Sequence, residues 1–216
     1  TNIEPDHLIN YDHSFNNLKE AFLEFIKKLP FNGMSIVCGD DPVIKELKKN
    51  FQRPHISYGF NTSNDYVLSD FKSNKTQSLF KLTSDSKSID FTFNMLGKHN
   101  VLNAAAAAIL CIYEGISIEI IQDSLLKFEG IDRRMQIFGE RRVNNNHCIY
   151  IDDYGHHPTE IEKTIEAIRE SFSGYKINMV FQPHRFTRTH DLFDKFIDVL
   201  GAVDQLLLLE IYSAGE

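Results

Sequence analysis

Short apolar runs alternate with helical patterns in the last third of the chain, and this alternation constrains the fold more than any other feature. After Gly130 the pattern predicts a strand over residues 134–141, followed by strand, helix, strand, helix and strand, the last one over residues 205–210. Strands that alternate with helices favour a parallel sheet with right-handed crossovers. We therefore expect an α/β domain with a parallel sheet at residues 131–216, and a domain boundary near Gly130.

The first 130 residues carry a different pattern, in which helices flank a region rich in strands. The expected elements are helices at residues 15–28, 98–113 and 118–128, a short helix that begins near Pro42, and strands at residues 34–38, 55–58, 66–71, 78–82 and 89–95. Ser14 and Ser117 are candidate N-caps for the helices that follow them. The last three strands alternate in polarity, which predicts an antiparallel section.

Chemically reactive side chains follow two apolar runs of the second half. The run at residues 147–150 leads into residues 152–160, DDYGHHPTE, and the run at residues 177–181 leads into residues 182–188, QPHRFTR. Open α/β sheets bind ligands outside the carboxyl ends of their strands. Two carboxylates, a phenol and several imidazoles exceed what a connecting loop needs, so we expect a ligand site at these strand ends.

Simpler roles remain open for the same residues. Asp152 or Asp153 can cap the helix that follows them, and His184, Arg185 and Arg188 can form a solvated turn. Arg185 and Arg188 are three residues apart, so on a helical turn both can also face one anion.

A glycine and a basic residue open the alanine-rich helix, in the run GKHNVLN at residues 97–103. His99 and Asn103 are four residues apart and share a helix face, and an amide can form two hydrogen bonds to an adenine edge. Tight packing of small residues is the competing explanation. Near the expected boundary, Arg134 is either surface charge or a hinge cation that reaches a phosphate when domains close. Near the start, His7 can cap a helix or bind a metal.

Charge and cysteine content narrow the class of protein. The formal net charge of −7, without a long basic run, argues against nucleic acid as a partner, while local arginine clusters suit a phosphorylated or carboxylated small substrate. The three cysteines are far apart and fit buried, reduced thiols. No run reaches the ~20 apolar residues of a membrane span and no signal peptide is seen, so we expect no membrane and a cytoplasmic location. Both ends look cut, which predicts a fragment of a longer protein.

Taken together, these motifs resemble the Mur ligase family, whose members are ATP-dependent amide-forming ligases of peptidoglycan synthesis. The similarity covers essentially the whole chain and rests on residues 1–7, 97–103, 130–134, 152–160, 181–188 and 212–216. The runs at residues 152–158 and 182–188 are most similar to the branch that adds L-alanine to UDP-N-acetylmuramate.

The resemblance implies a fold and a missing part. Residues 1–130 would be the later part of a central ATPase domain, with a mixed sheet and helices. Residues 131–216 would be most of a Rossmann-like C-terminal domain. Neither a UDP-sugar-binding domain nor the phosphate loop G-x-x-x-x-G-K-[ST] occurs in this chain. We therefore expect the fragment by itself to be inactive.

ATP and Mg²⁺ are the cofactors that the resemblance implies, and individual positions take roles from it. His7 corresponds to a magnesium-binding histidine, and Asn100 and Asn103 to the adenine-contacting motif. Arg134 corresponds to the hinge arginine that touches the ATP phosphates, and Asp153 to an aspartate near the ribose.

The remaining implied positions surround the incoming amino acid and the acyl phosphate. They are Tyr154, His156, His184, Arg185 and Arg188. With Arg134, three of them are catalytic candidates: His156, Arg185 and Arg188. From the chemistry alone, the imidazole of His156 can take the proton of the attacking amine.

Two other interpretations stay open, and the sequence leaves the oligomeric state undetermined. One is a related ligase with another substrate, such as a peptide-recycling ligase that attaches a murein tripeptide or a folylpolyglutamate-type ligase. The other is a non-catalytic piece that binds nucleotide or serves assembly.

Overall fold

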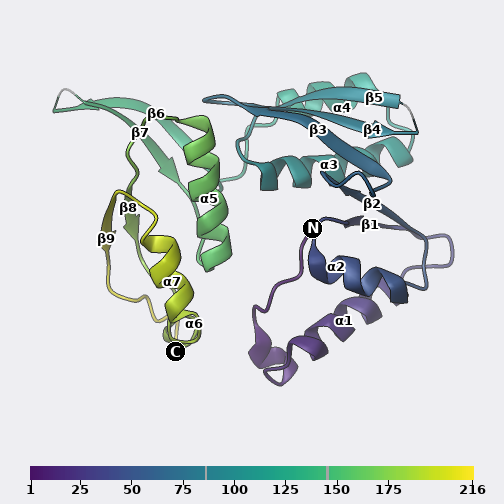
Figure 1. Ribbon diagram of the computed structural model, residues 1–216, viewed down its shortest axis with the longest axis horizontal. Helices are drawn as coiled ribbons and strands as arrows, with labels where there is room; N and C mark the ends of the chain where they lie inside the picture. The colour runs from purple at the N-terminus through teal and green to yellow at the C-terminus, as the bar shows by residue number, and fades with distance from the viewer. Residues whose placement is uncertain (86, 145) are drawn as a thin grey trace. The chain divides into compact units, whose positions relative to one another are not determined.

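The computed structural model in Figure 1 describes residues 1–85, 87–144 and 146–216. The chain forms two compact units, and each is described by itself. The first comprises Thr1–Lys72, Leu79–Phe93 and Asn100–Lys127, and the second comprises Ser73–Ser78, Asn94–His99 and Phe128–Glu216. Within the described residues, no helix combines the length and the apolar character needed to cross a membrane.

Five strands form one sheet in the order β1-β2-β3-β4-β5. Their bounds are β1 Ser35–Cys38, β2 His55–Gly59, β3 Tyr66–Ser73, β4 Ser78–Ser84 and β5 Lys87–Phe93. β1 pairs with β2 in parallel, and so does β2 with β3. Only four residues join β3 to β4, too few for a parallel crossover, so these neighbours run antiparallel, as the alternating pattern predicts.

The parallel pairing of β2 and β3 was not expected, because only residues 60–65 connect them. Asp40 holds this tight connection. Its carboxylate accepts hydrogen bonds from the backbone N–H of Phe60 at 2.6 Å, that of Asn61 at 3.0 Å and the side-chain amide of Asn64 at 2.9 Å. The connection is thus shorter than the crossover that a parallel pair usually has, and the Asp40 carboxylate holds it in place.

Helices complete the first unit and begin close to where the sequence predicts them. Their bounds are η1 Leu8–Tyr11, α1 Phe15–Lys27, α2 Pro42–Leu47, η2 Lys48–Asn50, α3 Lys98–Tyr113 and α4 Ile118–Leu126. Ser14 caps α1, because its hydroxyl accepts from the backbone N–H of Asn17 at 3.3 Å. Ser117 occupies the N-cap position of α4, but its hydroxyl makes no capping bond. Small residues of α3 lie on its buried face: Ala104, Ala105 and Ala108.

The second unit contains the predicted alternation of strands and helices. Its elements are β6 Gln136–Val143, β7 Asn146–Asp152, α5 Pro158–Ser171, β8 Asn178–Phe181, α6 Phe186–Asp191, α7 Phe193–Leu200 and β9 Gln205–Leu208. β8 and β9 pair in parallel, as predicted. β6 and β7 instead form an antiparallel ladder, because only residues 144 and 145 separate them.

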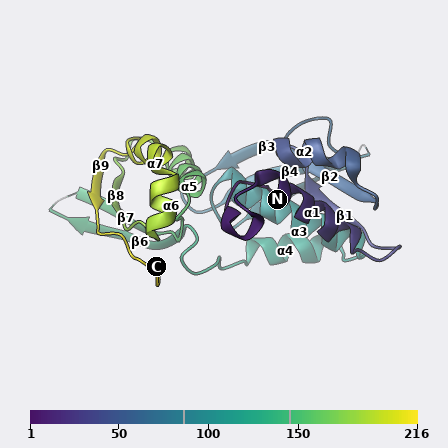
Figure 2. The ribbon, with the colours of Figure 1, turned by 90° about the horizontal axis from the view of Figure 1, so that it is seen from below.

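Helices α5 and α7 lie side by side (Figures 1 and 2) and share a core with β8. The buried core residues are Ile161, Ile165, Ile177, Phe181, Phe196 and Leu200. The aromatic rings of Phe181 and Phe196 lie 5.8 Å apart in this core. The carboxylate of Asp204 holds the start of β8, where it accepts from the backbone N–H of Ile177 at 2.8 Å and pairs with Arg169 at 2.7 Å.

Two short segments from before residue 130 pack on α5 within this second unit. The hydroxyls of Ser73 and Ser171 lie 2.7 Å apart, and Lys98 donates to Glu170 at 3.0 Å. Gly97, at φ +92°, approaches α5 so closely that an added Cβ would lie 2.8 Å from the Cβ of Ala167. The domain boundary near Gly130 stays a prediction.

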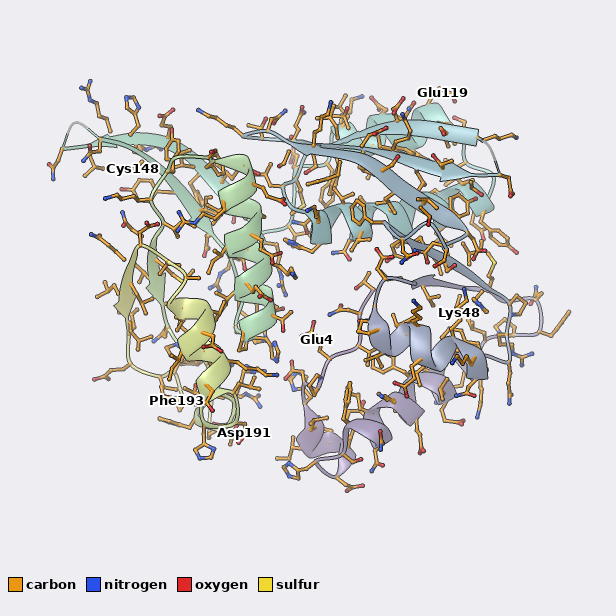
Figure 3. All side chains as sticks on the ribbon, in the orientation of Figure 1. Glu4, Lys48, Glu119, Cys148, Asp191 and Phe193 are labelled. Atoms are coloured by element: carbon orange, nitrogen blue, oxygen red, sulfur yellow. The ribbon has the colours of Figure 1, made fainter. Side chains whose placement is uncertain are left out.

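The three cysteines are free thiols. Cys38 is buried, and burial raises the pKa of its thiol. Cys111 and Cys148 are half-buried, and Figure 3 shows Cys148 on the hairpin of β6 and β7. The predicted burial is therefore complete for Cys38 alone.

Candidate functional site

Two strand ends of the second unit bring their side chains into one row. The guanidinium of Arg134 lies 5.8 Å from the centre of the Tyr154 ring, and that ring lies 5.2 Å from the ring of His156. The His156 ring lies 6.1 Å from His184, which lies 5.5 Å from Tyr212. The residues that follow β7 therefore meet those that follow β8, and the row combines cations, rings and titratable groups.

Asp153 fixes the backbone at one end of this row. Its carboxylate accepts from the backbone N–H of Met135 at 2.8 Å and from that of Gly155 at 2.8 Å. The interpretation in which Asp152 or Asp153 caps the next helix is wrong. The N-cap of α5 is His157, whose side chain accepts from the backbone N–H of Thr159.

Glu160 is the residue that sequence reasoning missed. One carboxylate oxygen, Oε2, accepts from the backbone N–H of His156 at 2.9 Å and that of His157 at 3.2 Å, while Oε1 accepts from Arg134 at 3.2 Å. Burial alone would raise the pKa of Glu160. The backbone N–H and charge of His156, together with the other donors, outweigh burial and hold that pKa below its ordinary value of 4.5.

The protonation of His156 follows from its neighbours. Its Nδ1 lies 3.1 Å from the carbonyl oxygen of Tyr154 and 3.5 Å from the carboxylate of Glu160. Both neighbours accept hydrogen bonds, so in the neutral imidazole the proton belongs on Nδ1. The lone pair is then on Nε2, which is the nitrogen able to accept a proton.

The loop after β8 is tightly fixed. The backbone N–H of Arg185 donates to the carbonyl of Tyr212 at 2.8 Å, and the N–H of Tyr212 donates to Pro183 at 2.9 Å. Arg185 has φ +73° and ψ 134°, a backbone conformation that favours glycine. Strain of this kind gathers at functional sites. The guanidinium of Arg188 donates to the carbonyl of His184 at 3.4 Å.

Positive charge outweighs the negative charge of Glu216 around His184. Desolvation, followed by the charges of Arg188, His156 and Arg185, lowers the pKa of His184 below its ordinary value of 6.5. The imidazole is therefore neutral near pH 7, while the two arginines remain charged. Such a loop favours an anionic ligand.

The other predicted positions lie in the first unit. Asn100 and Asn103 are on α3, half-buried and exposed respectively. His7 precedes η1 at φ 55°, and its Nε2 lies 3.5 Å from Asp6. Mg²⁺ prefers several oxygen ligands. Across residues 1–85, 87–144 and 146–216, no group of three or more histidine, cysteine or acidic side chains is arranged to hold a metal. The assignment of His7 as a magnesium ligand therefore stays a prediction.

The fold is that of an α/β protein in which polar and charged side chains gather at strand ends. The family model of the Mur ligase middle domain matches residues 1–111, and that of the Mur ligase glutamate ligase domain matches residues 133–215. The chain belongs to the Mur ligase family.

Solved structures of ligases share this architecture. UDP-N-acetylmuramate-alanine ligase MurC from Thermotoga maritima has 25% sequence identity and a TM-score of 0.76, over 97% of this chain and 44% of that one. MurF ligase from Thermotoga maritima in complex with ADP has 18% identity and a TM-score of 0.77, over 96% and 47%. Folylpolyglutamate synthase from Thermotoga maritima has 17% identity and a TM-score of 0.55, over 78% and 37%. The last two similarities show the fold alone. This chain spans less than half the length of each of these proteins.

Proposed function

We propose that this chain provides the acyl-transfer part of an ATP-dependent ligase that joins L-alanine to UDP-N-acetylmuramate. The observation that carries the proposal is the row from Arg134 through Tyr154 and His156 to His184, which lies beside two further arginines at the strand ends. The similarity to MurC supports the choice of alanine as the amino acid.

In the proposed reaction the γ-phosphoryl group of ATP passes to a carboxylate oxygen of UDP-N-acetylmuramate and ADP leaves. The amine of alanine then attacks the resulting acyl phosphate. Arg134 and Arg188 would offset negative charge on the phosphoryl group, since such transfers depend mainly on positioning and electrostatics. Arg185 would bind the carboxylate of alanine through the two-pronged geometry that a guanidinium offers.

His156 would accept the proton in the second step. As the amine nitrogen bonds to the acyl carbon, the carbon–oxygen bond to phosphate breaks and inorganic phosphate leaves. The proton from nitrogen passes to Nε2 of His156, because Nδ1 is directed at the Tyr154 carbonyl and the Glu160 carboxylate. A neutral His184 beside it adds no further positive charge that would repel a protonated base.

The test is phosphate release by the full-length gene product in the presence of ATP. We expect the full-length gene product to release phosphate only when both UDP-N-acetylmuramate and L-alanine are present. Residues 1–216 alone should show no phosphate release that depends on these two substrates. A murein tripeptide, or glutamate with a folate, replaces alanine in parallel reactions. Turnover with either of these and not with alanine would contradict the proposed substrate, and nucleotide binding without any turnover would favour a non-catalytic role.

A further inference from the structure

We propose that Glu160 is a positioning residue of the ligase reaction, one that holds Arg134 and His156 in a fixed relation through its two carboxylate oxygens. The inference rests on the proposed function, in which Arg134 faces phosphate and His156 accepts a proton.

The two carboxylate oxygens of Glu160 contact different residues. Oε1 accepts from Nη1 of Arg134 at 3.2 Å. Oε2 accepts from the backbone N–H of His156 at 2.9 Å and lies 3.5 Å from the Nδ1 of the same residue. Arg134 lies 26 residues before Glu160, so the carboxylate ties the start of β6 to the loop after β7. Hydrogen bonds between ionised groups are the strong ones, and they fix geometry.

Charge and location both favour an ionised Glu160. It stands at the third position of α5, where the N-terminal end of a helix stabilises negative charge. The side chain is one-third exposed, and its donors hold its pKa below the ordinary value. At neutral pH the carboxylate is thus charged opposite a guanidinium, and it accepts at both oxygens.

Helix capping explains only part of this arrangement. Glu160 completes a capping box with His157, and a glutamine at this position serves the same box. A neutral amide, however, has a single acceptor oxygen, so it cannot serve the cap and Arg134 together, and it offers no negative charge to the guanidinium or to Nδ1 of His156. Glu160→Gln should therefore keep the helix cap and lose the positioning of Arg134 and His156, so this variant separates capping from positioning.

The first measurement compares Glu160→Gln with Glu162→Gln in the full-length gene product. Glu162 is exposed on the same helix and is the matched control. We expect Glu160→Gln to keep its fold, with a melting temperature close to wild type, and to lose kcat by about tenfold or more. Glu162→Gln should match wild type in both. If kcat for Glu160→Gln equals that of wild type, the positioning role is overturned.

The second measurement does not depend on turnover. Long-range ¹H–¹⁵N spectra of the histidine side chains show which ring nitrogen carries the proton. In wild type the neutral His156 should be protonated at Nδ1. Glu160→Gln removes the charged acceptor and leaves the Tyr154 carbonyl, so Nδ1 should stay the main protonated nitrogen while the share of rings protonated at Nε2 rises, with Glu162→Gln unchanged. An unaltered His156 spectrum in Glu160→Gln overturns the proposal. Because this result needs no substrate, it stands apart from a failure of the proposed function, which would appear as absent ligation by wild type.

Discussion

His184 and Tyr212 are joined twice, through a parallel backbone bridge and through rings whose centres lie 5.5 Å apart. The segment after β8 is therefore held to the segment after β9 immediately before Arg185, which is the N-cap residue of α6. Arg185 is held in its strained backbone conformation by this fastening, which includes its own N–H bond to Tyr212.

Arg185→Gly and Arg185→Ala should separate stability from function. Both variants lose the guanidinium, so both should lose alanine-dependent turnover. Glycine accepts φ +73° without the cost of roughly 1–3 kcal/mol that such strain carries. Glycine also destabilises the folded state by roughly 0.5–1 kcal/mol relative to alanine, because it gives the unfolded chain more conformational freedom, and this offsets part of the relieved strain. Urea unfolding should find Arg185→Gly the more stable of the two, by about 1 kcal/mol. Equal stabilities would show that the backbone there is not strained.

Arg185→Lys tests the proposed contact with the alanine carboxylate. Lysine keeps the charge but cannot reproduce the two parallel hydrogen bonds of a guanidinium. The KM for alanine in the full-length gene product should rise about tenfold, which corresponds to ~1.4 kcal/mol, with a smaller change for ATP. An unchanged alanine KM and rate would remove Arg185 from the amino-acid site.

Arg134→Ala should depress turnover strongly and leave stability nearly unaltered. The Arg134 side chain is 42% exposed, and partly exposed ion pairs contribute little. Its melting temperature should fall by no more than about 2–4 °C. Arg142→Ala, in an exposed part of β6, serves as the control. Wild-type turnover of Arg134→Ala would mean that this arginine is surface charge.

Asp204 should make part of the stability depend on pH. The backbone N–H of Ile177, followed by the hydrogen bond from Arg169, holds the pKa of Asp204 below its ordinary value of 3.8. A depressed pKa means that the carboxylate stabilises the fold above 3.8 and that this contribution disappears as pH falls through the lower, folded value. Thermal melts should show Asp204→Asn less stable than wild type near pH 7, and the two should converge in strong acid. The exposed Asp198→Asn should follow wild type at every pH.

His184 should titrate below a typical histidine, and Arg188 should be one cause. Desolvation is the larger influence on its pKa, followed by the Arg188 charge. Arg188→Gln should therefore raise the pKa of His184 without restoring it fully to 6.5, as NMR titration can measure. A His184 pKa that is insensitive to Arg188→Gln would place the guanidinium farther away than the structure has it.

Gly97→Ala should destabilise more than Gly174→Ala. Both glycines have positive φ, at +92° and +85°, so each alanine meets a backbone cost of about 1 kcal/mol. At Gly97 the new Cβ would also crowd Ala167 and the His99 ring, whereas Gly174 faces open space. Overpacking adds roughly 1–3 kcal/mol. Chemical denaturation of the two variants measures this difference, and equal losses would argue against close packing of Gly97 on α5.

Local signals in the sequence predict much of the fold. The α3 helix begins right after Gly97 and ends at Tyr113, as predicted. The glycine that precedes it and the high helix propensity of its alanines are both local to the segment, so the sequence pattern is enough to predict it. Ser14 caps α1 for the same kind of reason. By contrast, the parallel pairing of β2 with β3 depends on Asp40, which lies far from the loop in sequence. No pattern within residues 55–73 reveals that carboxylate.

The candidate site divides in the same way. The two polar stretches after β7 and β8 are visible in the sequence, and the rings of His156 and His184 do meet. The contacts of Glu160 could not be predicted from the sequence. One of them is with Arg134, which is distant in sequence. The other is a capping box whose N-cap is His157 in place of the usual serine or threonine, so the motif is not recognisable in the sequence. The individual roles of the predicted site residues in binding and catalysis remain predictions.

The packing of early segments on α5 also sets an order of events during synthesis. Ser73 is synthesised 98 residues before its partner Ser171, and Lys98 is synthesised 72 residues before its partner Glu170. Contacts of such wide sequence separation form late, since the chain between them must first lose its freedom. The turn after β3 and the loop before α3 thus leave the ribosome well before the surface they cover exists. Ser73 and Lys98 can therefore reach their hydrogen-bond partners only after α5 itself has been made.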